Sequence, residues 1–138
     1  MRLHKDAKVD LLKGVPLFAG CSKADLQRIA SLADELDLGE GATLIREGER
    51  GREFIVIVDG SVDVTRKGKT LRTLGSGDFI GEIALVADVP RTATVTATSP
   101  VRLLVITDRA FKSLLERTPA MATKVLESLG ERLHSDAL

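Results

Sequence analysis

The chain has 138 residues, of which 43% are hydrophobic, and its 20 Lys and Arg balance 20 Asp and Glu to a formal net charge of zero. This length fits one domain, and the hydrophobic content supports a packed core, which excludes disorder by composition. The charge balance provides no basic surface for nucleic acid, and without Trp or Tyr there is no aromatic platform for stacking bases.

The small number of cysteines and histidines excludes a further class of site. Two histidines and one cysteine are too few for a Cys- and His-rich zinc site, and a lone cysteine suits a reducing cytosol. No apolar run approaches the roughly 20 residues of a membrane span, and no hydrophobic segment follows the N-terminus as in a secretory signal. We therefore expect a cytoplasmic protein with no metal, no nucleic-acid partner and no membrane insertion.

Residues 1–36 predict N-terminal helices. A short apolar turn ends near Gly14. Ser22 then has the features of an N-cap, and Asp25 follows it at the spacing of a capping box. Apolar residues recur at helical spacing after this point, which predicts a helix over about 23–33.

Residues 37–107 change to the short period of strands and turns. Nine of the 12 glycines fall between residues 39 and 81. The apolar, β-branched run 54–58 predicts a fully buried strand, and the Asp59-Gly60 dipeptide after it predicts a hairpin. Further strands are expected at 43–45, 61–65, 71–74 and on each side of Ser99-Pro100. Such even spacing is typical of an antiparallel barrel or jelly roll.

Residues 108–138 return to helical spacing. Thr107 and Asp108 are suited to start one helix, and Thr118 is a candidate N-cap before Pro119 at the first helical position. An apolar stripe with a spacing of four residues then predicts a longer helix. It comprises Met121, Val125, Leu129 and Leu133.

The stretch from Gly81 to Arg91 carries the strongest chemical signal. The segment 81–86 is long enough for one or two helical turns, whose N-terminus offers unpaired amides to an anion. If the segment folds back, the guanidinium of Arg91 faces those amides, and together they match a phosphate. Glu82, at the same helix tip, is suited to accept hydrogen bonds from a sugar hydroxyl. Phosphate, sugar and an apolar pocket describe a nucleotide.

This stretch resembles the phosphate-binding cassette of cyclic nucleotide-binding domains. The resemblance is carried by Gly-Glu-Ile-Ala-Leu at 81–85 and Pro-Arg-Thr-Ala-Thr-Val at 90–95, and it extends to 18–22, 44–49 and 60–64. It covers roughly residues 10–135. Similar domains are the sensor of the bacterial catabolite activator protein and the regulatory domains of cyclic nucleotide-dependent kinases and channels.

The resemblance implies a fold that is mainly β with flanking α. It would be an eight-stranded antiparallel jelly-roll barrel with N-terminal helices, a short phosphate-cassette helix and C-terminal lid helices. The whole chain, 1–138, would be a single cyclic nucleotide-binding domain, with the cassette at 79–95. From this length we expect a sensor domain without an effector domain.

The resemblance also implies residue roles. The cyclic phosphate would be held by Arg91 with Thr92, Ala93, Ile83 and Ala84. The ribose would be held by Gly81 and Glu82. The base and sugar would lie against Ile45, Val64, Leu74 and Ile80. The lid over the base would be formed by Leu129, Arg132 and Leu133.

We therefore expect a non-enzymatic regulatory module that senses cAMP rather than cGMP, with movement of the C-terminal helices as its output. Its partner would be an unidentified effector protein or a larger parent chain. The alternative is an interaction scaffold with the same jelly roll and no bound nucleotide. A cupin-type enzyme is disfavoured because His4 and His134 lie outside the predicted barrel, where such enzymes carry metal-binding histidines.

Overall fold

The computed structural model describes residues 5–51, 53–81 and 90–136. Helices α1 (Lys5–Lys13), η1 (Pro16–Phe18, a 3-10 turn) and α2 (Lys23–Leu32) precede the strands, and α4 (Asp108–Arg117) and α5 (Pro119–Asp136) follow them. The strands are β1 (Asp34–Leu38), β2 (Thr43–Ile45), β3 (Glu53–Asp59), β4 (Val62–Arg66), β5 (Lys69–Leu74), β6 (Phe79–Ile80), β7 (Thr94–Ala97) and β8 (Val101–Thr107).

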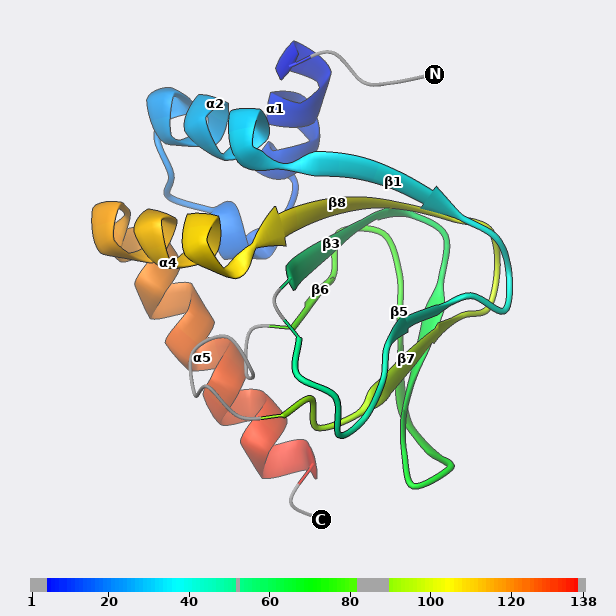
Figure 1. The fold of residues 1–138 in the computed structure, drawn as a ribbon. Coiled ribbons are helices and arrows are strands. Elements are labelled where there is room, and N and C mark those ends of the chain that lie inside the picture. Colours follow the sequence, from blue (N-terminus) through cyan, green and yellow to red (C-terminus); the bar gives the residue numbers. More distant parts are fainter. Residues whose placement is uncertain (1–4, 52, 82–89, 137–138) are drawn as a thin grey trace.

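The strands form two four-stranded antiparallel sheets, ordered β1-β8-β3-β6 and β2-β7-β4-β5. The helices gather on one side of the first sheet, and the second sheet lies on its other side (Figure 1). This confirms the expected mainly β architecture with flanking helices. In the described ranges no strand pairing joins the two sheets into one closed barrel, so closure stays a prediction.

The sheet formed around β3 and β8 separates two apolar cores. Along β3, Phe54 and Val56 face the core shared with the helices, whereas Ile55 and Ile57 face the core between the sheets. All four are at most 5% exposed, which confirms the buried strand expected at 54–58. Strand alternation explains the division, because successive side chains point to opposite faces.

Local signals place the helices as the sequence predicts. Ser22 accepts a hydrogen bond from the Asp25 amide, and Asp25 accepts one from the Ser22 amide, both at 3.1 Å. This capping box starts α2. Lys8 on α1 donates through Nζ to the carbonyl of Ala33, just beyond α2, at 2.8 Å. The two N-terminal helices are therefore joined at the end of α2.

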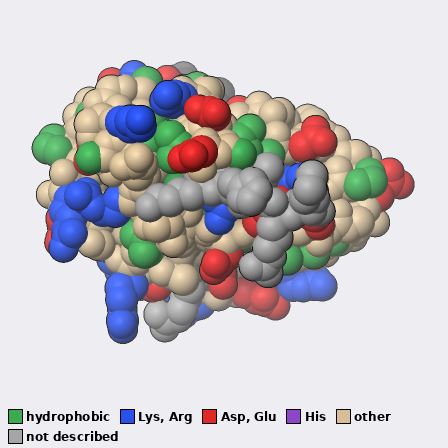
Figure 2. Space-filling model, turned by 90° about the horizontal axis from the view of Figure 1, so that it is seen from above, with side chains coloured by type: hydrophobic (Ala, Val, Ile, Leu, Met, Phe, Trp, Pro, Cys, Tyr) green, Lys and Arg blue, Asp and Glu red, His purple; other side chains and the backbone are tan. Residues whose placement is uncertain are grey.

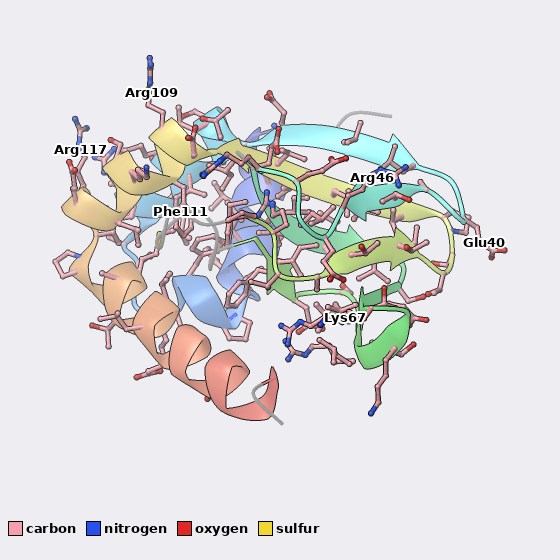
Figure 3. All side chains as sticks on the ribbon, turned by 60° about the horizontal axis from the view of Figure 1, so that its bottom comes forward. Glu40, Arg46, Lys67, Arg109, Phe111 and Arg117 are labelled. Carbon is pink, nitrogen blue, oxygen red and sulfur yellow. The ribbon has the colours of Figure 1, made fainter. Side chains whose placement is uncertain are left out.

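The helix α4 is attached to the sheet by stacked aromatic rings. Phe111 packs on Phe54 of β3 with ring centroids 4.5 Å apart, and Figure 3 shows Phe111 directed inward while Arg109 and Arg117 of the same helix point away. Thr107 caps α4 by accepting from the Ala110 amide at 3.2 Å. Thr118, the predicted cap of α5, is only 2% exposed, and its hydroxyl has no hydrogen-bond partner among the described residues.

The first strand begins at Asp34, three residues before the expected start of the strand region at 37. Its alternation is inverted: the side chain of Glu35 is 7% exposed, whereas Leu36 is 43% exposed. An acidic strand with an outward leucine does not carry the apolar pattern by which strands are recognised. For this reason the sequence did not predict β1.

The hairpin expected at Asp59-Gly60 is wrong. The dipeptide forms a turn between β3 and β4, but β3 pairs with β6 and β8, and β4 pairs with β5 and β7. The turn therefore carries the chain from one sheet to the other. The Lys67-Gly68 turn, by contrast, joins two paired strands, β4 and β5.

Charged side chains of both signs are spread over the face that includes α1, α2 and β1 (Figure 2), in keeping with the balanced composition. Among the described residues, no helix combines the length and the low polarity that a membrane crossing requires.

Candidate functional site

The main chain of Arg91 is fixed against the turn between β2 and β3. Its amide donates to the Glu49 carbonyl at 2.8 Å, and its carbonyl accepts from the Gly48 amide at 2.9 Å. Pro90 precedes Arg91, and β7 begins three residues after it. The position of the residue is therefore set by two segments that are far apart in the sequence.

The guanidinium of Arg91 is buried and held by two backbone carbonyls. The residue is 6% exposed. Its Nη1 atom donates to the Gly81 carbonyl at 3.0 Å, and Nη2 donates to the Glu53 carbonyl at 2.7 Å. Hydrogen bonds from a charged donor are stronger than neutral ones. The two carbonyls thus hold the planar group in one orientation at the start of the predicted cassette.

A carboxylate also lies beside this arginine. The side chain of Glu53 places an oxygen 3.8 Å from Arg91 Nη2, and that side chain is 53% exposed while that of Arg91 is 5% exposed. A half-exposed carboxylate interacts weakly with a cation because water screens the pair. The buried charge of Arg91 is therefore matched on one side by the half-exposed carboxylate of Glu53.

The four residues predicted to line the base and sugar pocket lie in one apolar cluster. Ile45, Val64 and Ile80 are buried at 8%, 7% and 3% exposure, and Leu74 is partly buried against them. The cluster lies between the two sheets. The structure thus brings these side chains together, and their contact with a ligand stays a prediction.

Two further predicted phosphate residues lie next to Arg91 in the chain. Ala93 is half-buried against the cluster between the sheets. Thr92 is exposed, and its carbonyl accepts from Arg66 Nε at 2.9 Å. Arg66 on β4 therefore ties this segment to the second sheet.

The remaining predicted site residues are described only in part. Gly81 has a φ of 99° and gives its carbonyl to Arg91, whereas Glu82, Ile83, Ala84 and the expected cassette helix lie outside the described residues. The predicted lid residues Leu129, Arg132 and Leu133 belong to α5, of which the structure describes the helix at these positions but not their side chains.

Sequence reasoning missed two residues beside Arg91. Glu53 provides both a carbonyl and a carboxylate, and Gly51 lies directly against the guanidinium. The sequence predicts Gly51 only as part of a turn, and the strand predicted at 54–58 does not include Glu53. A backbone carbonyl is present at every residue, so the sequence contains no signal for its use.

The other reactive groups of the described chain do not form a second centre. No group of three His, Cys, Asp or Glu side chains in the described ranges is arranged to hold a metal ion. Cys21 is half-buried, and burial with the nearby Asp25 carboxylate raises the pKa of its thiol. A raised pKa keeps the thiol protonated at neutral pH, which does not favour nucleophilic chemistry.

Comparisons with known proteins agree on one family. A family model described as "Cyclic nucleotide-binding domain" matches residues 35–118. A cAMP-dependent protein kinase regulatory subunit of Mycosarcoma maydis is 40% identical over 113 residues, which is 75% of this chain and 22% of the relative. A candidate potassium channel of Rhodopseudomonas palustris is 36% identical over 115 residues, 80% of this chain and 28% of the relative.

A solved structure with a similar fold adds a further relative. The solved structure of the Thermus thermophilus catabolite activator protein is 25% identical, with a TM-score of 0.80 over 88% of this chain and 60% of that one. Kinase regulatory subunits, a channel and the catabolite activator are the three classes that the sequence resembles. The chain spans about a quarter of the length of the two sequence relatives.

Proposed function

Because this chain belongs to the cyclic nucleotide-binding domain family, we propose that it is a regulatory module that binds cAMP and responds through its C-terminal helices. The observation that carries the proposal is the buried guanidinium of Arg91, held at one edge of the cassette by the carbonyls of Gly81 and Glu53. A buried arginine fixed in this way is prepared to meet a phosphate without further ordering of its side chain.

In this proposal the ligand is held at three places. Arg91 pairs with the cyclic phosphate, with Thr92, Ala93 and the backbone at Ile83 and Ala84 around it. Glu82 and Gly81 hold the ribose. The apolar cluster that contains Ile45 and Val64 faces the base and sugar. The chemistry is binding alone, and no residue is given a catalytic role.

Glu53 would make ligand binding an exchange of partners for Arg91. The ligand phosphate and the Glu53 carboxylate are both anions, and they would compete for the guanidinium of Arg91. Since the Glu53 side chain is half-exposed, it can leave Arg91 for water when the phosphate arrives. The guanidinium then keeps its hydrogen bonds to the carbonyls of Gly81 and Glu53, while the phosphate replaces the Glu53 carboxylate as its negatively charged partner.

The response would pass to α4 and α5. These two helices contact each other, and α5 also packs against η1. A ligand that binds better to one arrangement of these helices than to another shifts their populations. Leu129, Arg132 and Leu133 would close over the base in the bound arrangement. The preference for cAMP over cGMP is supported by the kinase regulatory subunit, whose name gives cAMP as its effector.

Titration calorimetry with cAMP and with cGMP tests the proposal. We expect the wild type to bind cAMP more tightly than cGMP, and Arg91→Ala to lose roughly 1.5–3 kcal/mol of binding free energy or more, the scale of a charge-assisted contact. Arg109→Ala, an outward arginine on α4, is the control and should bind as the wild type does.

Circular dichroism of Arg91→Ala must accompany the titration, because the substitution also leaves two carbonyls without their donor. A folded Arg91→Ala variant with unchanged affinity would contradict the phosphate assignment. A wild type that shows neither heat of binding nor a thermal shift with about 1 mM of either nucleotide, a concentration that reports even weak affinity, would instead favour an interaction scaffold.

A further inference from the structure

Gly51 lies against the face of the Arg91 side chain. A Cβ atom built on its backbone would overlap the Nε, Cζ and Nη2 atoms of Arg91. The space that a side chain at residue 51 would fill is thus already occupied by the guanidinium. We propose that Gly51 is a positioning residue, whose missing side chain allows Arg91 to reach the carbonyls of Glu53 and Gly81.

Backbone conformation does not explain a glycine at this position. Seven glycines of the described chain have a positive φ, and Gly51 is not among them. An alanine can therefore adopt the backbone of residue 51 without strain. What distinguishes Gly51 is the space beside it, in contrast to Gly39, which also lacks a positive φ but has no atom within 4 Å of a built Cβ.

The guanidinium has little room to retreat from a side chain at residue 51. Beside its Nη1 atom lies Gly81, where a built Cβ would be 2.8 Å from Nη1 and 2.6 Å from the Glu53 carbonyl oxygen. The group is thus flanked by two residues without side chains. To avoid a methyl group at residue 51, Arg91 must leave at least one of its two carbonyls.

That movement lowers the stability of the protein but does not disrupt its fold. Arg91 ends in a flexible chain, so its tip can turn away while the strands keep their pairing. The backbone bonds of Arg91 to Gly48 and Glu49 do not depend on the side chain. Gly51→Ala should therefore give a folded protein with a misplaced phosphate anchor. This consequence for binding rests on the proposed function.

The binding experiment compares Gly51→Ala with Gly39→Ala by titration with cAMP. We expect Gly51→Ala to weaken binding at least tenfold, approaching the loss in Arg91→Ala, and Gly39→Ala to bind within twofold of the wild type. If Gly51→Ala also binds within twofold of the wild type, the inference is overturned.

A second experiment needs no ligand and separates the inference from the proposed function. Urea unfolding is measured for the wild type, Gly51→Ala, Arg91→Ala and the double variant. We expect Gly51→Ala to lower the unfolding midpoint in the wild type and to have little effect in Arg91→Ala, because the atoms it displaces are then absent. Gly39→Ala should have the same effect in both backgrounds.

Equal effects of Gly51→Ala in the two backgrounds would overturn the positioning role whatever the protein binds. If the wild type fails to bind either cyclic nucleotide but the two substitutions are coupled, the proposed function falls and the positioning of Arg91 by Gly51 stands.

Discussion

The Nε atom of Arg102 on β8 lies 2.9 Å from a carboxylate oxygen of Asp37, its register partner on β1. The same Nε lies 3.2 Å from the inward carboxylate of Glu35. Strand β1 pairs only with β8 in the described chain. One arginine therefore holds two acidic residues of an edge strand to its neighbour.

This contact makes the stability of the fold depend on pH. The hydrogen bond from Arg102 is the main cause that lowers the pKa of Asp37 below its ordinary value of 3.8. Because the folded pKa is the lower one, the stabilisation is present above about pH 4 and is lost as the pH falls through the folded value. Asp37→Asn should lower the melting temperature slightly at neutral pH, and the difference from the wild type should close towards pH 2.

Thermal unfolding followed by circular dichroism measures that difference. Asp34→Asn is the control, since Asp34 lies on the same strand, where it pairs with Val105, and its carboxylate forms no hydrogen bond or ion pair with the described residues. A gap between wild type and Asp37→Asn that stays constant through the acid range would show that Arg102 does not act on the titration of Asp37.

The two threonines that precede the C-terminal helices should respond differently to the same substitution. Thr107→Val removes the bond to the Ala110 amide and should cost about 1 kcal/mol of unfolding free energy. Thr118→Val replaces a buried hydroxyl that has no partner among the described residues, and it should be neutral or stabilising by up to about 1 kcal/mol. Urea unfolding measures both, and a loss in Thr118→Val as large as that in Thr107→Val would indicate a partner for its hydroxyl.

Two glycines with similar backbones should tolerate alanine differently. Gly60 and Gly41 have φ values of 97° and 89°. A Cβ at Gly41 meets nothing within 4 Å, whereas at Gly60 it would overlap the Pro100 carbonyl oxygen and approach Val101 to 2.8 Å. Gly41→Ala should cost about 1–2 kcal/mol for the left-handed conformation alone. Gly60→Ala should cost more in urea unfolding, and equal losses would show that the Ser99-Pro100 turn moves aside easily.

Removing the competing carboxylate should strengthen ligand binding. Glu53→Gln keeps the carbonyl that holds Arg91 but removes the charge that lies 3.8 Å from Nη2. A half-exposed pair of this kind is worth about 0.2–1 kcal/mol, so cAMP affinity should rise by up to about fivefold, and less at high salt. Calorimetry in low and high salt measures the gain.

Glu40→Gln is the control for charge alone, because Glu40 lies in the exposed turn between β1 and β2, far from α4 (Figure 3). Weaker binding by Glu53→Gln would mean that the carboxylate helps to hold the guanidinium and does not compete for it.

The parts of the fold that the sequence predicted are those with strong local signals. The capping box at Ser22, the buried run that contains Phe54 and the break at Ser99-Pro100 are all found in the structure. Each depends on residues close together in the chain. Strand β1 was missed because Glu35 turns inward to meet Arg102, 67 residues away, and no local pattern records such a partner.

The same limit applies to the site. The sequence predicts a phosphate-binding role for Arg91 from its spacing to Gly81 and from the resemblance to the cassette, and this role stays a prediction. The two carbonyls that hold Arg91 and the space left by Gly51 depend on chain segments that meet only in three dimensions. The Asp59-Gly60 turn was recognised, but whether it joins paired strands is decided by the rest of the sheet.

The division of β3 into two faces has an evolutionary consequence. Ile55 belongs to the core beside the proposed ligand pocket, and its neighbour Val56 belongs to the core beneath the helices. Substitutions on one face can accumulate without repacking the other. Selection can therefore alter which small molecule is recognised without changing how the helices pack on the sheet. It can also adapt the helices to a new effector protein without changing the recognition of the small molecule. One sheet, inherited intact, would then serve proteins as different as a kinase subunit and a channel.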